Sequence, residues 1–586
     1  GSSVITHYNA IHCVPDPKTL NDQWNWVQHK DVQDRRLSSF GWGDGGGGPE
    51  AEMIEIARLV HDLEGCPRAT YTTVGGFMQG IEAELTDLPE YVGELYLELH
   101  RGTLTSIAQI KRGNRKAELA MRDAEFLSVL AALQGHAYPA GELLTLWKGL
   151  LTRQFHDILP GSSIAEVNDE AIVAFAGYRK GAQDISSRAL SSLAGPGSEG
   201  RWLLANTLSW DRTGEISWEG APSGTRPADA TIAAQWVEDP TGTSQLVLEG
   251  LTLPALGGRV VDLVAGDPGG DSPFVVAGDR VETPYAAVHF DSRGRIDSLI
   301  DRATQREIVR PGAVLNALLV GEDIPGQWDN WDIDRDQRLK MRDDSELLSR
   351  DVVANGPLQL RIRSTYKIGR SSTLTQDMVF HAGTAQVDFE TVVDWAEKRR
   401  LMKASFSVNV WAEQARHEIQ YGYAERPTHT NLAQDRARFE VCAHKWTDLS
   451  DAGFGVALLN DSKYGVSVAG SEIGLSLLKS GVHPDPRGDE GLHLMTYSLL
   501  PHAGTFSVPS VVRPAYELNI APIAVQASAG AIDLASLLTV DAPNVIVEAI
   551  KWAEEGNAFI VRLYEAGRAG TRVTVTLATP VAAAEV

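Results

Sequence analysis

The periodicity of the apolar residues changes near residue 200 of this chain of 586 residues, and that change restricts the fold more than any other feature. Between residues 105 and 195, apolar side chains recur at the three-to-four-residue spacing of amphipathic helices. From about Arg201 to Val586, apolar and polar residues alternate over short runs, which is typical of half-buried strands. We therefore predict a multidomain α+β protein in which a helical block precedes large β-sandwich (supersandwich) domains.

Three amphipathic helices are expected in the helical block. Apolar residues at helical spacing predict helices over Arg115–Leu133 and over Gly141–Leu159. Ser163 and Glu166 form a capping-box pattern, which predicts the start of a third helix. Because the connections are short, the three helices should form an antiparallel bundle.

The first 90 residues mix short apolar runs and loops with a helical pattern at Ala51–Leu63 and a strand-like piece at Ala69–Thr73. This alternation suits the C-terminal end of an α/β barrel, since a complete barrel needs far more residues. A linker is expected at Gly195–Gly200. The predicted domains are the end of the barrel (1–90), the three-helix bundle (91–195), a β-sandwich domain (196–505) and a C-terminal β domain (506–586).

The net charge of −24 disfavours nucleic acid and anionic membranes as partners and suits a neutral or small substrate, although acidic balance is also a common solubility device. No apolar run is long enough to span a membrane. Three cysteines (Cys13, Cys66 and Cys442) lie far apart, which fits a reducing cytoplasm.

His156 and Asp157 are the sharpest local candidates for chemistry. On a helix that continues to Leu159, His156 falls opposite the apolar stripe and points away from the bundle. A neutral imidazole beside a carboxylate suits metal binding. An exposed pair without function would look the same.

Two other segments carry candidate residues. Asp44 lies in a glycine-rich loop, which would expose its carboxylate; a flexible linker has the same composition, and no Lys-Ser/Thr follows to indicate a phosphate loop. Trp328–Asp332 interleaves aromatic and acidic residues. Aromatic faces stack on sugar rings and carboxylates accept hydrogen bonds from hydroxyls, so this segment suits a carbohydrate surface; buried strand-end tryptophans are the alternative.

Together these segments resemble glycoside hydrolase family 38, most closely its cytosolic and vacuolar α-mannosidase branch. The matching stretches keep the family order over essentially the whole chain: Phe40–Pro49, Gly93–Thr103, Ile110–Arg115, Gln154–Asp157, Trp328–Asp332, Arg426–His429, Ala443–Trp446, Leu459–Gly465 and Arg562–Glu565. The resemblance implies an α/β barrel, a three-helix bundle and β domains. It also implies retaining hydrolysis of α-linked mannose in oligosaccharides or glycans by an aspartate nucleophile. A divalent metal, zinc or in some relatives cobalt, is expected on two histidines and two aspartates.

The resemblance assigns roles residue by residue. His156 matches the metal-binding histidine of the bundle, and Asp157 matches its neighbour that hydrogen-bonds the bound mannose. Asp44 falls in the loop of acid/base-region aspartates, although many relatives carry two consecutive acids there and this chain has Asp44-Gly45. Segments that border the family's pocket contain five further candidates for substrate binding: His100, Asp329, Trp331, Lys463 and Tyr464.

The family's first metal motif and its nucleophile segment have no counterpart in residues 1–40. We therefore expect this chain alone to be inactive as a mannosidase and to bind zinc weakly. The resemblance further implies a cytoplasmic enzyme that forms homo-oligomers. The alternative is a non-catalytic carbohydrate-binding or assembly fragment, a role that β-sandwiches often serve.

Overall fold

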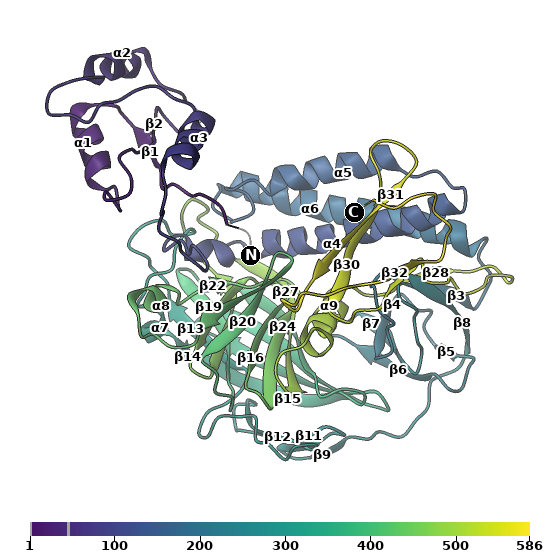
Figure 1. Ribbon diagram of the computed structural model, residues 1–586. Coiled ribbons are helices and arrows are strands. Elements are labelled where there is room, and N and C mark those ends of the chain that lie inside the picture. The colour runs from purple at the N-terminus through teal and green to yellow at the C-terminus, as the bar shows by residue number, and fades with distance from the viewer. Residues whose placement is uncertain (1–2, 44–46, 586) are drawn as a thin grey trace. The chain divides into compact units, whose positions relative to one another are not determined.

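The computed structural model describes residues 3–43 and 47–585, and the chain divides into two compact units, Gly1–Leu95 and Tyr96–Val586. Asp44 lies outside the described residues. Figure 1 shows the ribbon of both units.

The described residues of the first unit form a parallel pair of short strands and three helices: β1 (Ala10–Cys13), α1 (Pro17–Asn25), β2 (Ser38–Phe40), α2 (Ala51–Val60) and α3 (Val74–Glu84). Parallel pairing is typical of α/β folds, but it does not by itself establish a barrel, which stays a prediction. The strand expected at Ala69–Thr73 was wrong, because these residues adopt no regular structure. Instead, the Thr73 hydroxyl accepts a hydrogen bond from the Gly76 amide at 3.1 Å and caps α3.

Three long helices open the second unit and confirm the predicted bundle: α4 (Ala108–Leu133), α5 (Ala140–Arg153) and α6 (Ala165–Ala194). Figure 1 shows them side by side. Leu143, Leu150, Phe175 and their neighbours from all three helices form one buried apolar cluster. Gly149 lets two helices approach closely, because a Cβ there would lie 2.7 Å from the Tyr178 ring.

Three details of the bundle differ from the prediction. Helix α4 begins at Ala108 rather than Arg115. Helix α5 ends at Arg153 rather than Leu159, so the candidate His156 lies in a turn and not on a helix. The capping box was also wrong, because Ile164 is the N-cap of α6 and has no side-chain cap. The Ser163 hydroxyl instead donates to the Asp157 carbonyl at 2.8 Å. Ser163 therefore stabilises the turn that carries the candidate residues.

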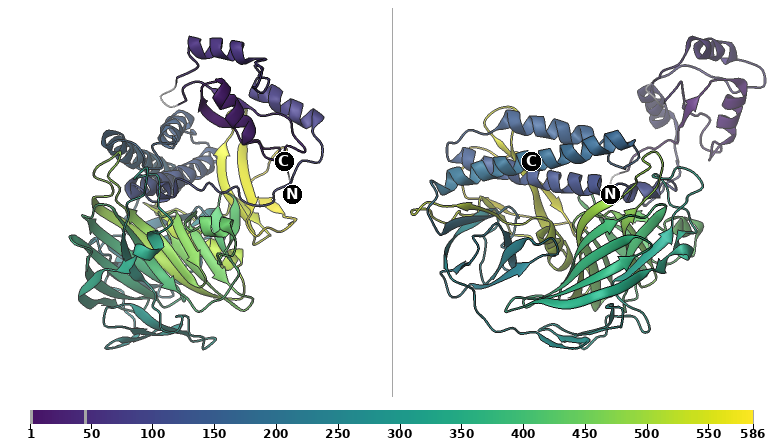
Figure 2. Two further views of the ribbon diagram at one scale, coloured as in Figure 1. Left: turned by 90° about the vertical axis from the view of Figure 1, so that its left-hand side faces the viewer. Right: turned by 180° about the vertical axis from the view of Figure 1, so that it is seen from behind.

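Two large antiparallel sheets form most of the rest (Figure 2). The nine-stranded sheet has the order β15 (Ser345–Asn355), β16 (Gln359–Ile368), β17 (Ser372–His381), β18 (Val387–Trp395), β27 (Gly491–Ala503), β24 (Phe454–Asn460), β23 (Trp446–Ser450), β20 (Gln414–Ile419) and β21 (Gly422–Pro427). The six-stranded sheet has the order β14 (Arg342–Asp343), β13 (Ala317–Glu322), β19 (Arg400–Ser407), β26 (Glu472–Lys479), β25 (Gly465–Ala469) and β22 (Val441–Cys442).

A single apolar cluster contains residues of both sheets, as expected of a β-sandwich. At its centre the Phe389 and Tyr497 rings stack at 5.2 Å, and Phe406 of β19 meets them edge-on. The predicted β-sandwich architecture is thus confirmed. The alternation of apolar and polar residues along the strands is what buries one face of each sheet.

Smaller antiparallel sheets complete the second unit. They are β12 (Ile296–Asp301) with β11 (Ala286–Phe290), β10 (Arg280–Glu282) and β9 (Val275–Ala277); β28 (Ile523–Gln526) with β3 (Arg201–Asn206), β8 (Gly257–Ala265) and β5 (Thr225–Pro227); β4 (Ile216–Glu219) with β7 (Ser244–Glu249) and β6 (Ala233–Glu238); β29 (Leu538–Val540) with β32 (Val575–Leu577); and β30 (Val545–Trp552) with β31 (Phe559–Glu565). The short helices are η2 (Arg101–Leu104), α7 (Gln337–Lys340), α8 (Ala433–Ala437), η3 (Val508–Val512) and α9 (Arg513–Asn519).

Strand β28, which follows the predicted boundary at 505/506, pairs with β3 directly after the bundle. The domain boundaries drawn from the sequence stay predictions. Among the described residues, none of the helices has the length and apolar character needed to cross a membrane.

Candidate active site

His156 and Asp157 lie in the turn between α5 and α6, which spans residues 154–161. The His156 side chain is 77% exposed, and its Nε2 lies 3.4 Å from the Asp157 carboxylate. The Phe155 ring packs against the imidazole, with the ring centroids 4.3 Å apart. Both polar groups are therefore accessible to a ligand, as the sequence indicated, although the reason is a turn and not the outer face of a helix.

A second segment, around η2, carries His100. This residue is exposed and adopts a left-handed conformation, with φ of 62°. Its neighbour Arg101 is buried: the guanidinium donates to the carbonyls of Glu98 and Ala437 at 2.6 and 2.9 Å and lies 4.4 Å from the Phe439 ring centroid. Arg101 thus fixes the backbone from which His100 projects.

The third segment is the loop Trp328–Asp332, which contains the candidates Asp329 and Trp331. The rings of Trp328 and Trp331 meet edge-on at 5.8 Å, and Trp331 lies 6.4 Å from the His483 ring. Trp328 is 58% exposed, so an aromatic face is available for a sugar ring. The carboxylate of Asp329 accepts a hydrogen bond from the Val482 amide at 3.1 Å.

Direct hydrogen bonds connect these three segments. The Thr103 amide donates to the Trp331 carbonyl at 3.2 Å, which joins η2 to the loop. The Asn330 side chain donates to the Gly161 carbonyl at 3.0 Å, and the Ser106 hydroxyl donates to the Asn330 carbonyl at 2.6 Å. Hydrogen bonds therefore connect the three segments that carry His100, Asp329, Trp331, His156 and Asp157, although these segments are far apart in the sequence.

Lys463 and Tyr464 occupy a different environment. Lys463 is buried and donates to the Leu477 carbonyl at 2.7 Å. The Tyr464 ring lies 4.2 Å from the Arg115 guanidinium, whose Nε donates to the Tyr464 hydroxyl at 3.1 Å. These two side chains contact α4 and the β domain rather than the exposed segments, so any effect on a ligand passes through Arg115.

Burial changes the acidity of two buried lysines in this part of the second unit, Lys463 and Lys111. Desolvation lowers the pKa of Lys463 to about 8, against an opposing effect of Asp489. Desolvation likewise lowers the pKa of Lys111, on α4, to about 7. Burial also raises the pKa of the Tyr464 hydroxyl.

The sequence patterns did not indicate Lys111, Ser106 and Asn330, all of which are buried and hydrogen-bonded at the meeting point of the segments. The sequence holds one pattern that involves Lys111 and one that involves Asn330. Lys111 follows an apolar residue in a matched stretch, and Asn330 separates the two Trp-Asp pairs of Trp328–Asp332. Neither pattern distinguishes a buried polar residue from an exposed one.

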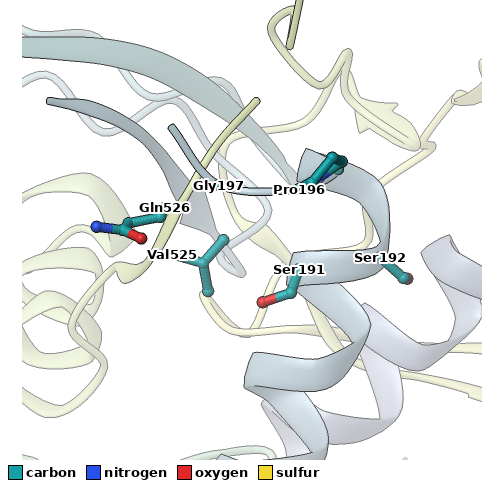
Figure 3. A pocket seen from close by; sticks show the side chains of 7 residues that line it. Ser191, Ser192, Pro196, Gly197, Val525 and Gln526 are labelled. Carbon is teal, nitrogen blue, oxygen red and sulfur yellow. The ribbon is translucent and has the colours of Figure 1, made fainter. Parts of the chain in front are cut away.

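Two cavities lie elsewhere in the second unit. The first, of about 750 Å³, is lined by small or uncharged residues at the end of α6 and on β28, among them Ser191, Pro196 and Gln526 (Figure 3). The second, of about 350 Å³, lies between the start of α6 and residues 485–493. Its Arg487 donates to Asp485 and to Asp169 at 3.0 and 3.1 Å, and Asp489 and Glu490 also line the cavity, so acidic side chains outnumber basic ones there.

Four regions of the chain match domains of known protein families. The family 38 N-terminal domain of the glycosyl hydrolases matches residues 2–94, and the α-mannosidase middle domain matches residues 98–193. The family 38 C-terminal domain matches residues 281–487, and the C-terminal β-sandwich domain of the same family matches residues 544–586. This chain belongs to glycosyl hydrolase family 38, the α-mannosidase family. The resemblance inferred from the motifs is therefore confirmed.

Individual family 38 proteins show the same relationship. Human Alpha-mannosidase 2C1 is 37% identical over 548 residues, which cover 90% of this chain and 50% of the relative. Alpha-mannosidase G of Dictyostelium discoideum is 32% identical over 639 residues, which cover 98% of this chain and 57% of the relative. The chain spans about half the length of these relatives.

A solved structure shares the fold. An α-mannosidase from Enterococcus faecalis V583 superimposes with a TM-score of 0.74 over 90% of this chain and 70% of that chain, at 15% identity. The helical middle domain and the β-sandwich domains of this family 38 member are thus arranged as in a known α-mannosidase.

Proposed function

We propose that this polypeptide provides the bundle and β domains of a retaining, metal-dependent α-mannosidase that hydrolyses α-linked mannose in oligosaccharides or glycans. The observation that carries the proposal is the hydrogen bonding of the turn with His156 and Asp157 to the Trp328–Asp332 loop. It unites an exposed imidazole, a carboxylate and an aromatic face on connected segments of a family 38 chain, and these are the groups that sugar recognition requires.

Each accessible candidate receives a role in this proposal. The Asp157 carboxylate accepts hydrogen bonds from mannose hydroxyls. Trp331 and its neighbour Trp328 stack on a sugar face and exclude water from it. His100 and Asp329 border the same ligand. Lys463 and Tyr464 act indirectly, by holding α4 in place.

Zinc, or cobalt, is the metal that the proposal requires. His156 suits one coordination position, because its ring is exposed and its Nε2 faces the Asp157 carboxylate. Among the residues that the structure describes, no group of three His, Cys, Asp or Glu side chains is close enough to hold a metal ion. His156 therefore fits as a single ligand, and the described residues do not complete a zinc site, which needs three or four converging groups.

We accordingly propose that the nucleophile and the other ligands come from polypeptide outside the described residues. Asp44, in the glycine-rich loop outside those residues, stays the candidate for the acid/base region. The same proposal makes the chain alone inactive and assigns the unit at residues 1–95 to the end of an α/β barrel. A cytoplasmic location, supported by the scarcity of cysteine, and homo-oligomer formation, supported by the resemblance, belong to the same hypothesis.

The test compares two proteins, this chain and the full-length gene product that contains it, each with p-nitrophenyl α-mannoside and with zinc or cobalt. We expect hydrolysis by the full-length protein and none by the chain alone. His156→Ala should abolish hydrolysis. The matched control is His136→Ala, since His136 is likewise an exposed histidine that follows a bundle helix. Failure of the full-length protein to release mannose from any α-mannoside would refute the proposal.

A non-catalytic sugar-binding role is the second candidate, and the exposed ring of Trp328 favours it. It predicts that the isolated chain binds mannose in calorimetry and that the full-length protein does not hydrolyse mannosides. Absence of mannose binding by the isolated chain would count against this second role.

A further inference from the structure

Lys111 lies at the point where the start of α4 meets the turn at residues 154–161. Its ammonium is buried and donates to three carbonyl oxygens: Ser106 at 2.5 Å, Leu159 at 3.1 Å and Pro160 at 3.0 Å. An ammonium has three N–H donors, so these acceptors use its full capacity. A buried donor group of this kind is costly to leave unpaired, so the three carbonyl contacts fix the position of the Lys111 side chain.

The other end of the turn is attached to the same face of α4. Gln154 donates to the side chains of Asn114 and Glu118 at 2.9 and 2.6 Å. Positions 111, 114 and 118 are spaced by three and four residues, which places them on one side of a helix. One face of α4 therefore holds both ends of the turn that carries His156 and Asp157.

The end of the turn is also packed tightly against the start of α4. Gly161 has a φ of 76°, and a Cβ on it would lie 2.3 Å from the Ser106 carbonyl, the same oxygen that accepts from Lys111. The Gly161 carbonyl accepts from Asn330, whose own carbonyl accepts from Ser106. We call these four residues (Ser106, Lys111, Gly161 and Asn330) the buried junction.

We propose that Lys111 is a positioning residue, which holds the turn with His156 and Asp157 in one geometry relative to the Trp328–Asp332 loop. Lys111 does so by donating to the carbonyls of Leu159 and Pro160, while Asn330 attaches the loop to the next residue, Gly161. The consequence for sugar binding rests on the proposed function; the effect on the turn does not. Loss of the ammonium leaves carbonyl oxygens without a donor, and the turn opens.

The first measurement is hydrogen–deuterium exchange of peptides that cover residues 154–163, in the whole chain. Lys111→Met keeps the length of the side chain and removes its charge and donors. We expect these amides to exchange about tenfold faster or more, since local opening then costs less free energy. Amides in β17 and β18 should exchange as in the wild type. Lys111→Arg, which retains donors, should give a smaller acceleration.

The matched control is Arg212→Met. Arg212 is also a buried cation that donates to two carbonyls, those of Ile520 and Glu517, at 2.7 and 3.0 Å. Its loss should lower the stability of the protein without changing exchange at residues 154–163. Equal exchange of this segment in Lys111→Met and Arg212→Met would overturn the proposal. If Lys111→Met does not fold, two other single variants, Lys111→Arg and Asn330→Ala, are measured. The proposal is overturned if both exchange at residues 154–163 as the wild type does.

Mannose affinity, measured by calorimetry on the same substitutions made in the full-length protein, separates this proposal from the proposed function. A weaker affinity in Lys111→Met than in Arg212→Met supports both. If the wild-type chain and the full-length protein bind no mannoside while exchange accelerates as expected, the proposed function fails and the positioning role of Lys111 stands. If exchange is unchanged and mannose binding is normal, the positioning role of Lys111 fails and the proposed function stands.

Discussion

Arg115 connects the helical bundle to the β domain, and its removal gives the sharpest stability prediction. The side chain is 4% exposed and donates four hydrogen bonds: to the carbonyl and side-chain oxygens of Asn460 at 3.2 and 3.0 Å, to the Lys463 carbonyl at 3.2 Å and to the Tyr464 hydroxyl at 3.1 Å. Its guanidinium also lies 4.2 Å from the Tyr464 ring centroid.

The acceptors differ in what they lose when Arg115 becomes Met. Both Asn460 oxygens keep other donors, among them Asn519 and the Lys463 amide at 3.0 and 2.7 Å. The Lys463 carbonyl and the Tyr464 hydroxyl depend on Arg115 within the described residues. Two orphaned acceptors and one lost cation–π contact predict a loss of about 4 kcal/mol in the free energy of unfolding.

Urea unfolding followed by tryptophan fluorescence measures this loss. Arg115→Lys should lose about 2 kcal/mol, because an ammonium cannot reproduce the planar fork of donors. The control Arg188→Met removes an arginine that is 58% exposed and pairs with Glu142, so it should cost less than about 0.5 kcal/mol. A loss below about 1 kcal/mol for Arg115→Met would refute the assigned role of Arg115. It would also remove the reason for treating Tyr464 as an indirect contributor.

Two further predictions concern pH and the turn. Burial, with Arg115, Lys445 and Arg426 nearby, lowers the pKa of His444 to about 3, below its unfolded value of about 6.5. As the pH falls, His444 therefore takes up a proton in the unfolded chain before it does so in the folded protein, and the free energy of unfolding decreases below pH 6.5. The variant His444→Gln should recover about 2 kcal/mol of that loss at pH 5. Denaturation curves at pH 5 and 7.5 check this prediction. Gly161→Ala should destabilise the turn more than Gly135→Ala, which has a φ of 92° but open space around its Cβ. Equal melting temperatures for these two variants would contradict the tight packing of Gly161 on Ser106.

The sequence determined the class of each region and the family of the chain. Helical periodicity predicts the bundle, and alternation predicts the strands, because a side chain's face follows directly from the spacing along a helix or strand. His156 and Asp157 are predicted site residues, because they lie in a stretch that matches a motif of the family. Their exposure was predicted on a false premise, because α5 ends at Arg153 and not at Leu159.

The tertiary structure alone decided which candidates meet. Lys463 and Tyr464 occur in a matched stretch like the others, yet Arg115 and Leu477 occupy their polar groups. Ser163 looked like a helix cap, but the Asp157 carbonyl takes its hydroxyl. Local sequence patterns cannot predict these hydrogen bonds, because the partner of each polar group is distant in the sequence or lies outside the expected element. The same holds for Lys111, whose three acceptors come from two segments that only the folded bundle brings together.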